Sequence, residues 1–271
     1  MPKQNMLKKK LQGQVAIVTG ASRGLGVAIA ELLTQAGASV ALLARGQEEL
    51  ETQAERLRQQ GAQAIAIATD VSDQEQVEHA VEVTMERFRR VDIVINNAAL
   101  AWPVEEVVEC DPTEWAYTIH VNLIAPFYLA HTVLPAMLEQ GYGRIVNVSS
   151  GLSSAVYAGL SAYSASKAGL DQLTRIMALE VKKSGVTVNA LYPGVVDTDM
   201  QADLRSVDTT GSSMDLSLFH KFAEEGKLLP PLVAARPAYW LVGPWSKGRT
   251  GEVFTFRDEA WLAQVEKDLT S

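Results

Sequence analysis

The sequence contains a single cysteine in 271 residues, so no disulfide can form within the chain. That residue, Cys110, stands between Glu109 and Asp111. Acidic neighbours disfavour the thiolate that a nucleophilic cysteine needs, so we expect a structural role for it. The scarcity of cysteine fits a reducing compartment, and we expect a cytoplasmic location.

Positive charge is also scarce. The chain carries 24 Lys and Arg against 32 Asp and Glu, a formal net charge of -8. A general nucleic-acid binder needs a basic face to meet phosphates, so no nucleic-acid partner is expected. The histidines His79, His120, His131 and His220 are scattered without ligand spacing, and no catalytic metal is expected.

Long apolar runs are missing from the pattern as well. No stretch is judged long and apolar enough to span a bilayer, so no membrane partner is expected. Residues 1–12 carry lysines but no apolar run of the kind a signal peptide needs, and they are predicted to be a short disordered lead-in. We find no linker or repeat after them, so residues 13–271 are predicted to form one domain.

What the sequence does contain is a regular alternation of apolar strands and helices. Such alternation with uniformly apolar strands indicates an α/β fold, a doubly wound parallel sheet with helices on both faces. The pattern changes after Pro193, and residues 198–231 are predicted to cover a substrate as a lid. The predicted strands are 15–19, 39–44, 64–69, 92–96, 144–148, 186–191 and 252–256, and the predicted helices are 24–37, 47–60, 73–90, 113–139 and 162–183.

A glycine-rich turn follows the first predicted strand. It reads Thr-Gly-Ala-Ser-Arg-Gly-Leu-Gly over residues 19–26. Glycine permits the positive φ of a tight turn and lets a pyrophosphate approach bare backbone, while the next helix offers free N–H groups to the anion. Tight turns also use glycine for purely structural reasons. The position after the first strand of an alternating chain favours nucleotide binding.

The spacing Thr-Gly-x-x-x-Gly-x-Gly resembles that of the short-chain dehydrogenase/reductase family, and other motifs of that family follow in order along the chain. One departure is Ala99, where the family usually has glycine. The resemblance implies a Rossmann fold and hydride transfer between a nicotinamide cofactor and a carbonyl or alcohol carbon. The motifs are Asp70-Val71, Asn96-Asn97-Ala98-Ala99, Asn122, Ser149-Ser150, Tyr163 with Lys167, and Pro193-Gly194 with Val196 and Thr198.

The candidate catalytic residues are Asn122, Ser150, Tyr163 and Lys167. Tyr163 and Lys167 are four apart on one predicted helix, so both can point at the same spot, and a cation beside a tyrosine lowers its pKa. Such a pair alone occurs in many helices without meaning. The resemblance implies that Tyr163 is the general acid/base, that Lys167 lowers its pKa and binds the cofactor ribose, that Ser150 positions substrate, and that Asn122 supports a proton-relaying water. Ser149 is the rival for the serine role.

The cofactor predicted is NADP(H). NAD binders place an acid at the end of the second strand, where this chain has Ala44, and Arg45 and Arg23 can reach a ribose phosphate. The alternative is that both are ordinary surface arginines. The predicted cofactor-binding residues are Gly20, Ser22, Arg23, Gly24, Leu25, Gly26, Arg45, Asp70, Val71, Asn97, Ala98, Ala99, Tyr163, Lys167, Pro193, Gly194, Val196 and Thr198.

The substrate is less determined. Apolar residues of the lid, with Leu100 and Trp102, suggest an apolar or aromatic carbonyl compound, although they could equally pack the lid onto the domain. The segments 197–201 and 225–229 resemble the sepiapterin and benzil reductase branch, yet the position of that branch's pterin-anchoring acid falls at Phe254, so no pterin is predicted. A ketone, diketone or 3-oxoacyl reductase fits.

Two other functions stay open: an NAD-dependent alcohol dehydrogenase of the same family, and a catalytically silent nucleotide-binding sensor or scaffold. The intact set of Ser150, Tyr163 and Lys167 argues against the silent protein. The predicted helices 113–139 and 162–183 resemble those that pair at the family's usual dimer interface, so a homo-oligomer, a dimer or tetramer, is expected.

Overall fold

The computed structural model describes residues 9–271 and contains a parallel seven-stranded sheet. The strand order is β3-β2-β1-β4-β5-β6-β7, and each neighbouring pair is parallel. This confirms the doubly wound fold and places every predicted strand within a residue or so of its expected bounds. The strands are β1 (Val15–Thr19), β2 (Ser39–Ala44), β3 (Ala64–Ala68), β4 (Ile93–Asn96), β5 (Gly143–Val148), β6 (Val186–Tyr192) and β7 (Val253–Thr255).

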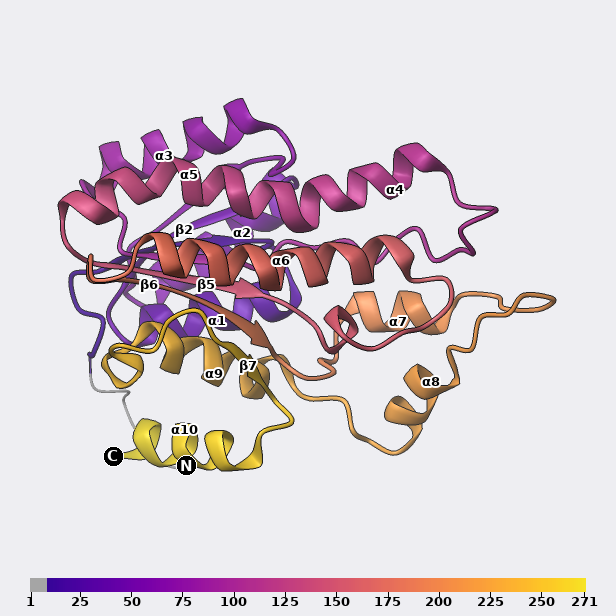
Figure 1. The fold of residues 1–271 in the computed structure, drawn as a ribbon. Helices are drawn as coiled ribbons and strands as arrows, with labels where there is room; N and C mark the ends of the chain where they lie inside the picture. The colour runs from indigo at the N-terminus through magenta and orange to yellow at the C-terminus, as the bar shows by residue number, and fades with distance from the viewer. Residues whose placement is uncertain (1–8) are drawn as a thin grey trace.

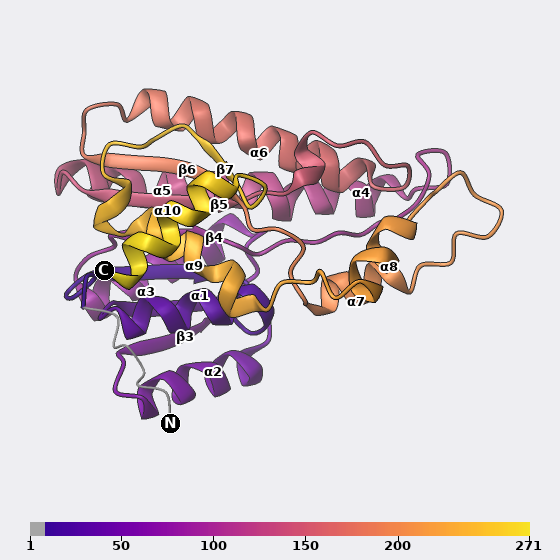
Figure 2. The ribbon, with the colours of Figure 1, turned by 90° about the horizontal axis from the view of Figure 1, so that it is seen from below.

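Helices cover both faces of the sheet (Figures 1 and 2) because successive strand residues point to opposite sides. Val18 of β1 joins one buried cluster, and its neighbour Ile17 joins the other. The first cluster includes residues of α1 (Gly24–Gln35), α2 (Gln47–Gln59), α9 (Pro231–Val242) and α10 (Glu259–Thr270). The second includes residues of α3 (Gln74–Phe88), α5 (Ala125–Glu139) and α6 (Ser161–Glu180). Neither α9 nor α10 is predicted from the sequence.

The predicted helix 113–139 is interrupted. It consists of α4 (Pro112–Ile119), a π turn at His120–Ile124 and α5. This composite helix corrects the expectation about apolar stretches, because residues 112–139 are long and apolar enough to cross a membrane, with a mean hydropathy of 1.5 over the best window. Yet 44% of that window is buried inside the fold, and α5 packs on α3 and the sheet, as a core helix does.

The predicted disordered lead-in is wrong in its last part. Leu11 is 1% exposed within the first cluster, and its N–H donates to the Ala36 carbonyl at 2.9 Å. One buried leucine and a backbone hydrogen bond therefore fix residues 9–12 against the end of α1. The rest of the predicted lead-in, residues 1–8, lies outside the described residues.

The strand order reverses between β1 and β4, and open α/β sheets place ligands beyond the carboxyl ends of the strands at such a point. The glycine turn follows β1, and the Asn96 motif follows β4. The segment after β6 contains two short helices, α7 (Asp199–Arg205) and α8 (Ser217–Glu224), which lie beyond the sheet on the side where Figure 1 also shows the start of α4. We call residues 198–231 the lid segment.

Candidate active site

A pocket of about 770 Å³ opens at the carboxyl ends of the strands. It is bounded by the glycine turn, the loops after β2 to β6, the start of α6 and the first turns of α7. Ser150 and every predicted cofactor-binding residue except Gly26 line it, and Asn122 does not. Residues from seven separate stretches of sequence therefore meet at one place.

The glycine turn has the backbone that the sequence predicts. Gly20 and Gly24 have φ values of +63° and +57°, which favour glycine. The turn is held by its neighbours: the Asn97 side-chain amide donates to the Thr19 carbonyl at 2.9 Å, and the Thr19 hydroxyl accepts from the N–H groups of Asn97 and Ala98. Asn97 therefore shapes the turn with its side chain while it lines the pocket.

Gly26 does not line the pocket, because it faces inward. A Cβ on it would lie 2.3 Å from the Gly20 carbonyl oxygen and 2.8 Å from Nδ2 of Asn97. Its lack of a side chain lets the first turn of α1 pack against the loop. The structure therefore gives Gly26 a packing role, and its predicted contact with the cofactor stays a prediction.

Asn122 is fully buried in the π turn, away from the pocket surface. Its side-chain oxygen accepts from the Leu100 N–H at 2.8 Å, and its amide donates to the Leu100 carbonyl and the Ser166 hydroxyl. Both ends of the side chain are engaged, so Asn122 joins the loop after β4 to α6. Any contribution to a proton relay would come from the backbone geometry that it fixes.

Ser150, Tyr163 and Lys167 lie together at one end of the pocket. Tyr163 and Lys167 project from the first turns of α6, and the Lys167 Nζ lies 5.7 Å from the centre of the Tyr163 ring. Lys167 is 2% exposed and donates to the Val148 carbonyl at the end of β5 at 2.7 Å. The Ser150 hydroxyl accepts from the Leu152 N–H at 3.2 Å. The structure thus brings together three of the four predicted catalytic residues.

The protonation states follow from burial. Desolvation raises the pKa of Tyr163, while hydrogen bonding by Ser150 opposes the rise. Burial also lowers the pKa of Lys167 to about 8, against the charge of Asp171. Sequence reasoning expects Lys167 to lower the pKa of Tyr163. In this structure the pKa of Tyr163 is raised, first of all by burial, so Tyr163 is a protonated hydroxyl at neutral pH.

Ser149, the rival serine, also lines the pocket. It is 3% exposed, and no residue between 9 and 271 offers its hydroxyl a hydrogen-bond partner. Its backbone N–H donates to the Leu191 carbonyl, which continues the pairing of β5 with β6. A buried hydroxyl is costly to leave unpaired, so the pocket has a polar group ready for a bound molecule.

These observations fit a dinucleotide cofactor. The first turn of α1 contains no acidic residue, and no side chain of the described part of the chain caps its N–H groups. A Cβ on Gly24 would lie 3.1 Å from Cγ2 of Thr198. Glycine therefore leaves space between the glycine turn and the start of the lid segment. The bare backbone and the uncapped N–H groups of α1 suit the pyrophosphate of such a cofactor. The unpaired Ser149 hydroxyl suits a polar group elsewhere on it.

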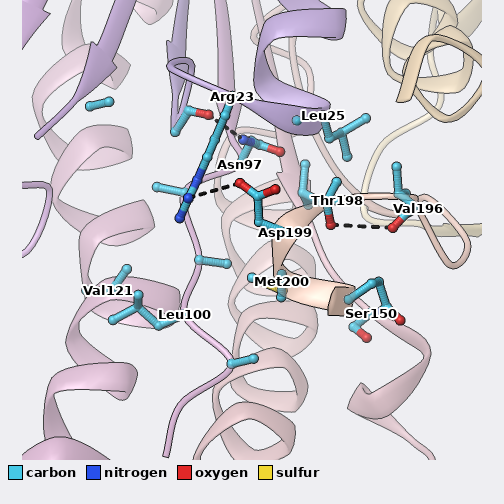
Figure 3. Close-up of a pocket in the computed structure, with 18 of the residues that line it drawn as sticks. Arg23, Leu25, Asn97, Leu100, Val121, Ser150, Val196, Thr198, Asp199 and Met200 are labelled. Carbon is cyan, nitrogen blue, oxygen red and sulfur yellow. Dashed lines mark hydrogen bonds and ion pairs between the residues drawn. The ribbon is translucent and has the colours of Figure 1, made fainter. Parts of the chain in front are cut away.

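The arginines predicted to read a ribose phosphate are both engaged. Arg45 donates to the Tyr117 hydroxyl at 3.4 Å, and that hydroxyl donates to Asp70 at 3.3 Å. Arg23 forms an ion pair of 3.0 Å with Asp199 in the first turn of α7, as Figure 3 shows. The Arg23 and Asp199 side chains are 76% and 65% exposed, so solvent screens this pair and its energy is small.

Asp70 anchors the loop after β3. Burial acts to raise the pKa of its carboxyl, but hydrogen bonds from Ser72 and Tyr117 outweigh it and hold that pKa below the usual range. The nearby charge of Arg45 acts in the same direction. Asp70 is therefore a fixed carboxylate beside the predicted cofactor site.

The lid segment shares a small apolar cluster with the loop after β4 and with Leu160 before α6. Leu204, Leu216 and Phe219 are buried in it, and Met200 packs on its edge. Only Met200 and Leu204 of these four also line the pocket. Some lid residues are therefore placed to contact a substrate, and others only pack the lid onto the domain. Glu106 accepts hydrogen bonds from the Ser213 backbone and hydroxyl and so ties the far end of the lid to the loop after β4.

Several residues of the pocket belong to no motif that the sequence predicts, and four of them carry polar or charged side chains of interest. Tyr117, Glu49, Tyr192 and Asp199 line it, yet none belongs to a motif quoted above as cofactor-binding or catalytic. Asp199 stands next to Thr198, and its acidic character was visible, but nothing in the sequence pairs it with Arg23. Phe254, at the position discussed for pterin recognition, is 4% exposed and packs on Trp240 and Trp261 in the core.

Among residues 9–271, no group of three or more His, Cys, Asp or Glu side chains is placed to hold a metal ion. Cys110 lies outside the pocket, and burial together with Glu105, Asp111 and Glu114 raises the pKa of its thiol.

Comparison with known proteins supports the family resemblance that the sequence motifs indicate. The family model described as short chain dehydrogenase matches residues 14–209. The 3-oxoacyl-[acyl-carrier-protein] reductase FabG of Vibrio cholerae is 34% identical over 242 residues, which cover 89% of this chain and 95% of that protein. The likeness of the C-terminal third to the sepiapterin and benzil reductase branch stays a prediction.

Two solved structures share the fold. An actinorhodin polyketide ketoreductase with NADPH is 34% identical at a TM-score of 0.82, and the match covers 90% of this chain and 95% of that one. An NAD⁺-bound xylitol dehydrogenase is 26% identical at a TM-score of 0.84, covering 91% and 98%. The neighbours thus include users of both nicotinamide cofactors. The glycine turn, the Ser150, Tyr163 and Lys167 cluster and the family match lead to one conclusion: this chain is an oxidoreductase of the short-chain dehydrogenase/reductase family.

Proposed function

We propose that this oxidoreductase uses NADP(H) to reduce a ketone to an alcohol. One observation carries the proposal: Ser150, Tyr163 and Lys167 meet at one end of a pocket whose other end holds the glycine turn and Arg45. When bound, the nicotinamide cofactor supplies the hydride. The names of two relatives, a 3-oxoacyl reductase and a polyketide ketoreductase, are those of enzymes that reduce a carbonyl group.

The proton that reduction requires comes from Tyr163. Because burial raises the pKa of Tyr163, its hydroxyl holds the proton at neutral pH and can donate it to the carbonyl oxygen as negative charge develops there. Ser150 donates a second hydrogen bond to the same oxygen and orients it. The Lys167 ammonium then stabilises the negative charge left on Tyr163. Asn122 fixes the π turn behind α6.

The residues near β2 support NADP(H) over NAD(H). Ala44 ends β2 without a carboxylate that would repel a phosphate, and Arg45 lines the pocket directly after it. Arg23 could contribute only by leaving Asp199, so Arg45 is the principal candidate for phosphate recognition. If Arg45 does not bind the ribose phosphate of NADP(H), a comparison of kcat/KM for NADPH and NADH would show an NAD-dependent enzyme.

The substrate end of the pocket supports an apolar or aromatic ketone. Trp102, Tyr192, Met200 and Leu204 line it. A screen of NADPH consumption against ketones, diketones, quinones and 3-oxoacyl thioesters tests the proposal. Turnover of a ketone supports it. Binding of NADPH without turnover of any of these compounds would favour a silent nucleotide-binding protein.

We also propose a cytoplasmic homo-oligomer that binds neither nucleic acid nor membrane. Phe127 and Leu138 on α5, with Ile176 and Leu179 on α6, are 45–70% exposed, and apolar side chains on two helices of one face suit a second copy of the chain. Light scattering at micromolar concentration checks this, and a monomer would contradict it.

A further inference from the structure

One buried acid lies beside the reacting groups without a part in the proposed chemistry. Tyr163, Lys167 and Asp171 follow each other at intervals of four along α6. Residues at this spacing are neighbours on one helix face, with Cβ atoms roughly 5–6 Å apart. Lys167 is 2% exposed and Asp171 is 6% exposed. The helix therefore buries a cation and an anion one turn apart.

The Asp171 carboxyl is incompletely satisfied. Its Oδ1 atom is enclosed, and no donor in residues 9–271 hydrogen-bonds it. One turn further along the helix, Thr174 is fully paired, since it accepts from the Asn147 amide and donates to the Leu170 carbonyl. An enclosed carboxylate oxygen without a donor is costly, so hydrogen bonding does not explain why an acid stands at position 171.

Lys167 has the complementary need. Its hydrogen bond goes to a neutral acceptor, the Val148 carbonyl, which stabilises an ammonium less than a carboxylate does. Burial lowers its pKa to about 8, and the charge of Asp171 acts against that fall. Without the acid, the lysine would lose its proton closer to neutral pH.

The other charged and titratable groups of the pocket come from several elements. α6 contributes Tyr163, α4 contributes Tyr117, and β6 with the lid segment contributes Tyr192, Asp197, Asp199 and Asp203. The nucleotide end contributes Arg23, Arg45, Glu49 and Asp70. Among the described residues that line the pocket, β5, the loop after it and the π turn add none. Of the described residues, Asp171 is the buried acid on the helix face of Lys167 whose charge favours the Lys167 ammonium.

We propose that Asp171 is a positioning residue that keeps Lys167 charged in the active site. The inference rests on the proposed function, because a charged Lys167 is what stabilises the anion left on Tyr163 after proton transfer. Asp171 touches neither the pocket surface nor the reacting atoms, so it acts only through Lys167. Asp171, which does not line the pocket, then helps to set the pH range in which the enzyme is active.

The direct test follows the titration of Lys167 without substrate or cofactor. Lysine labelled with ¹³C at Cε is followed by NMR over pH, and the Lys167 signal is the one missing from Lys167→Met. The wild-type midpoint is expected near 8. In Asp171→Asn it should fall by about one unit, because loss of a nearby opposite charge shifts a pKa by roughly that much. Asp171→Glu should restore most of the shift.

The control is Thr174→Val, which disturbs a buried polar group on the same helix without removing a charge. Its Lys167 midpoint should match wild type. If Asp171→Asn does not fold, Asp171→Leu replaces the acid with an apolar side chain and carries the same expected shift. An unchanged midpoint in the uncharged variants, or an equal shift in Thr174→Val, would overturn the proposal.

A second measurement connects the titration to turnover. The rate of ketone reduction, as kcat/KM, should fall as pH rises through the Lys167 pKa, because the ammonium is present below it and lost above it. In Asp171→Asn this alkaline limb should move down by about one unit, so that kcat/KM near pH 8 is about fivefold below wild type. If the wild type reduces no ketone, the proposed function fails, while the NMR titration still decides the role of Asp171.

Discussion

The nucleotide end of the pocket and the lid segment are built in different ways. The glycine turn, Asn97 and the ends of β1 and β4 belong to the continuous core of the sheet, where backbone and side-chain hydrogen bonds fix each group. The buried side chains of the lid segment lie outside the two large cores and pack in a small apolar cluster with Ala101, Val104 and Leu160. Exposed polar contacts, Arg23 with Asp199 and Glu106 with Ser213, add to this packing. The difference suggests that the core fixes the chemistry and the cofactor, while the lid selects the substrate.

The largest expected effect comes from Tyr163→Phe, which removes the proton donor from the rigid part of the site. Turnover should fall by about 10²–10⁴-fold, the usual contribution of general acid catalysis, while NADPH binding is retained. Steady-state kinetics and a fluorescence titration of NADPH check the two halves of this expectation. Substantial remaining turnover would remove Tyr163 from the role of acid.

The next effect concerns the cofactor. Ala44→Asp together with Arg45→Ala should shift preference from NADPH toward NADH by about one to two powers of ten, because a charge-assisted contact to phosphate is lost and a carboxylate is added. The ratio of kcat/KM for the two cofactors measures it. Since Arg23 remains, some NADPH use is expected. A wild type that already prefers NADH, or a ratio that does not move, would contradict the role of Arg45.

The lid should affect substrate choice and little else. Leu204→Ala removes apolar volume that lines the pocket and should raise KM for its preferred ketone by about tenfold, with the Kd of NADPH nearly unchanged. Leu216→Ala is the matched control, because Leu216 packs in the same cluster without lining the pocket. Equal changes in ketone preference in both variants would mean that the lid acts only through its stability.

The smallest effect is expected at the exposed pair between the two regions. Asp199→Asn frees Arg23, and NADPH affinity should rise by no more than about fivefold, since an exposed ion pair contributes up to about 1 kcal/mol. The gain should shrink as salt is added. A large loss of NADPH affinity would show instead that Asp199 holds the lid over the cofactor.

Much of the fold was predictable because the core strands are continuous apolar runs. β1 and β2 were predicted at their observed bounds, and Tyr163 and Lys167 meet as their spacing on one helix requires. Local patterns could not show contacts between distant segments. The pairing of Arg23 with Asp199, and the chain from Arg45 through Tyr117 to Asp70, depend on how loops pack after folding.

The degree to which individual side chains are buried could not be predicted from the sequence either. The residue types predict that the charge of Lys167 lowers the pKa of Tyr163, whereas burial of Tyr163 raises that pKa in the structure. The sequence predicts a disordered lead-in over residues 1–12 because no apolar run follows its lysines, yet the single leucine Leu11 reaches the core. Gly26 packs against the Gly20 carbonyl, a contact that the sequence pattern does not show because it depends on how the turn folds back on the helix.

The central claim is that this pocket transfers a hydride to a ketone carbon while Tyr163 protonates the oxygen. Its most direct test uses NADPH labelled with deuterium at the transferable C4 position, a ketone that the screen identifies, and mass spectrometry of the product. Our account predicts an alcohol with the deuterium on its carbinol carbon from the wild type, and almost none from Tyr163→Phe at equal NADPH occupancy. An unlabelled alcohol, or equal labelled product from both proteins, would contradict it.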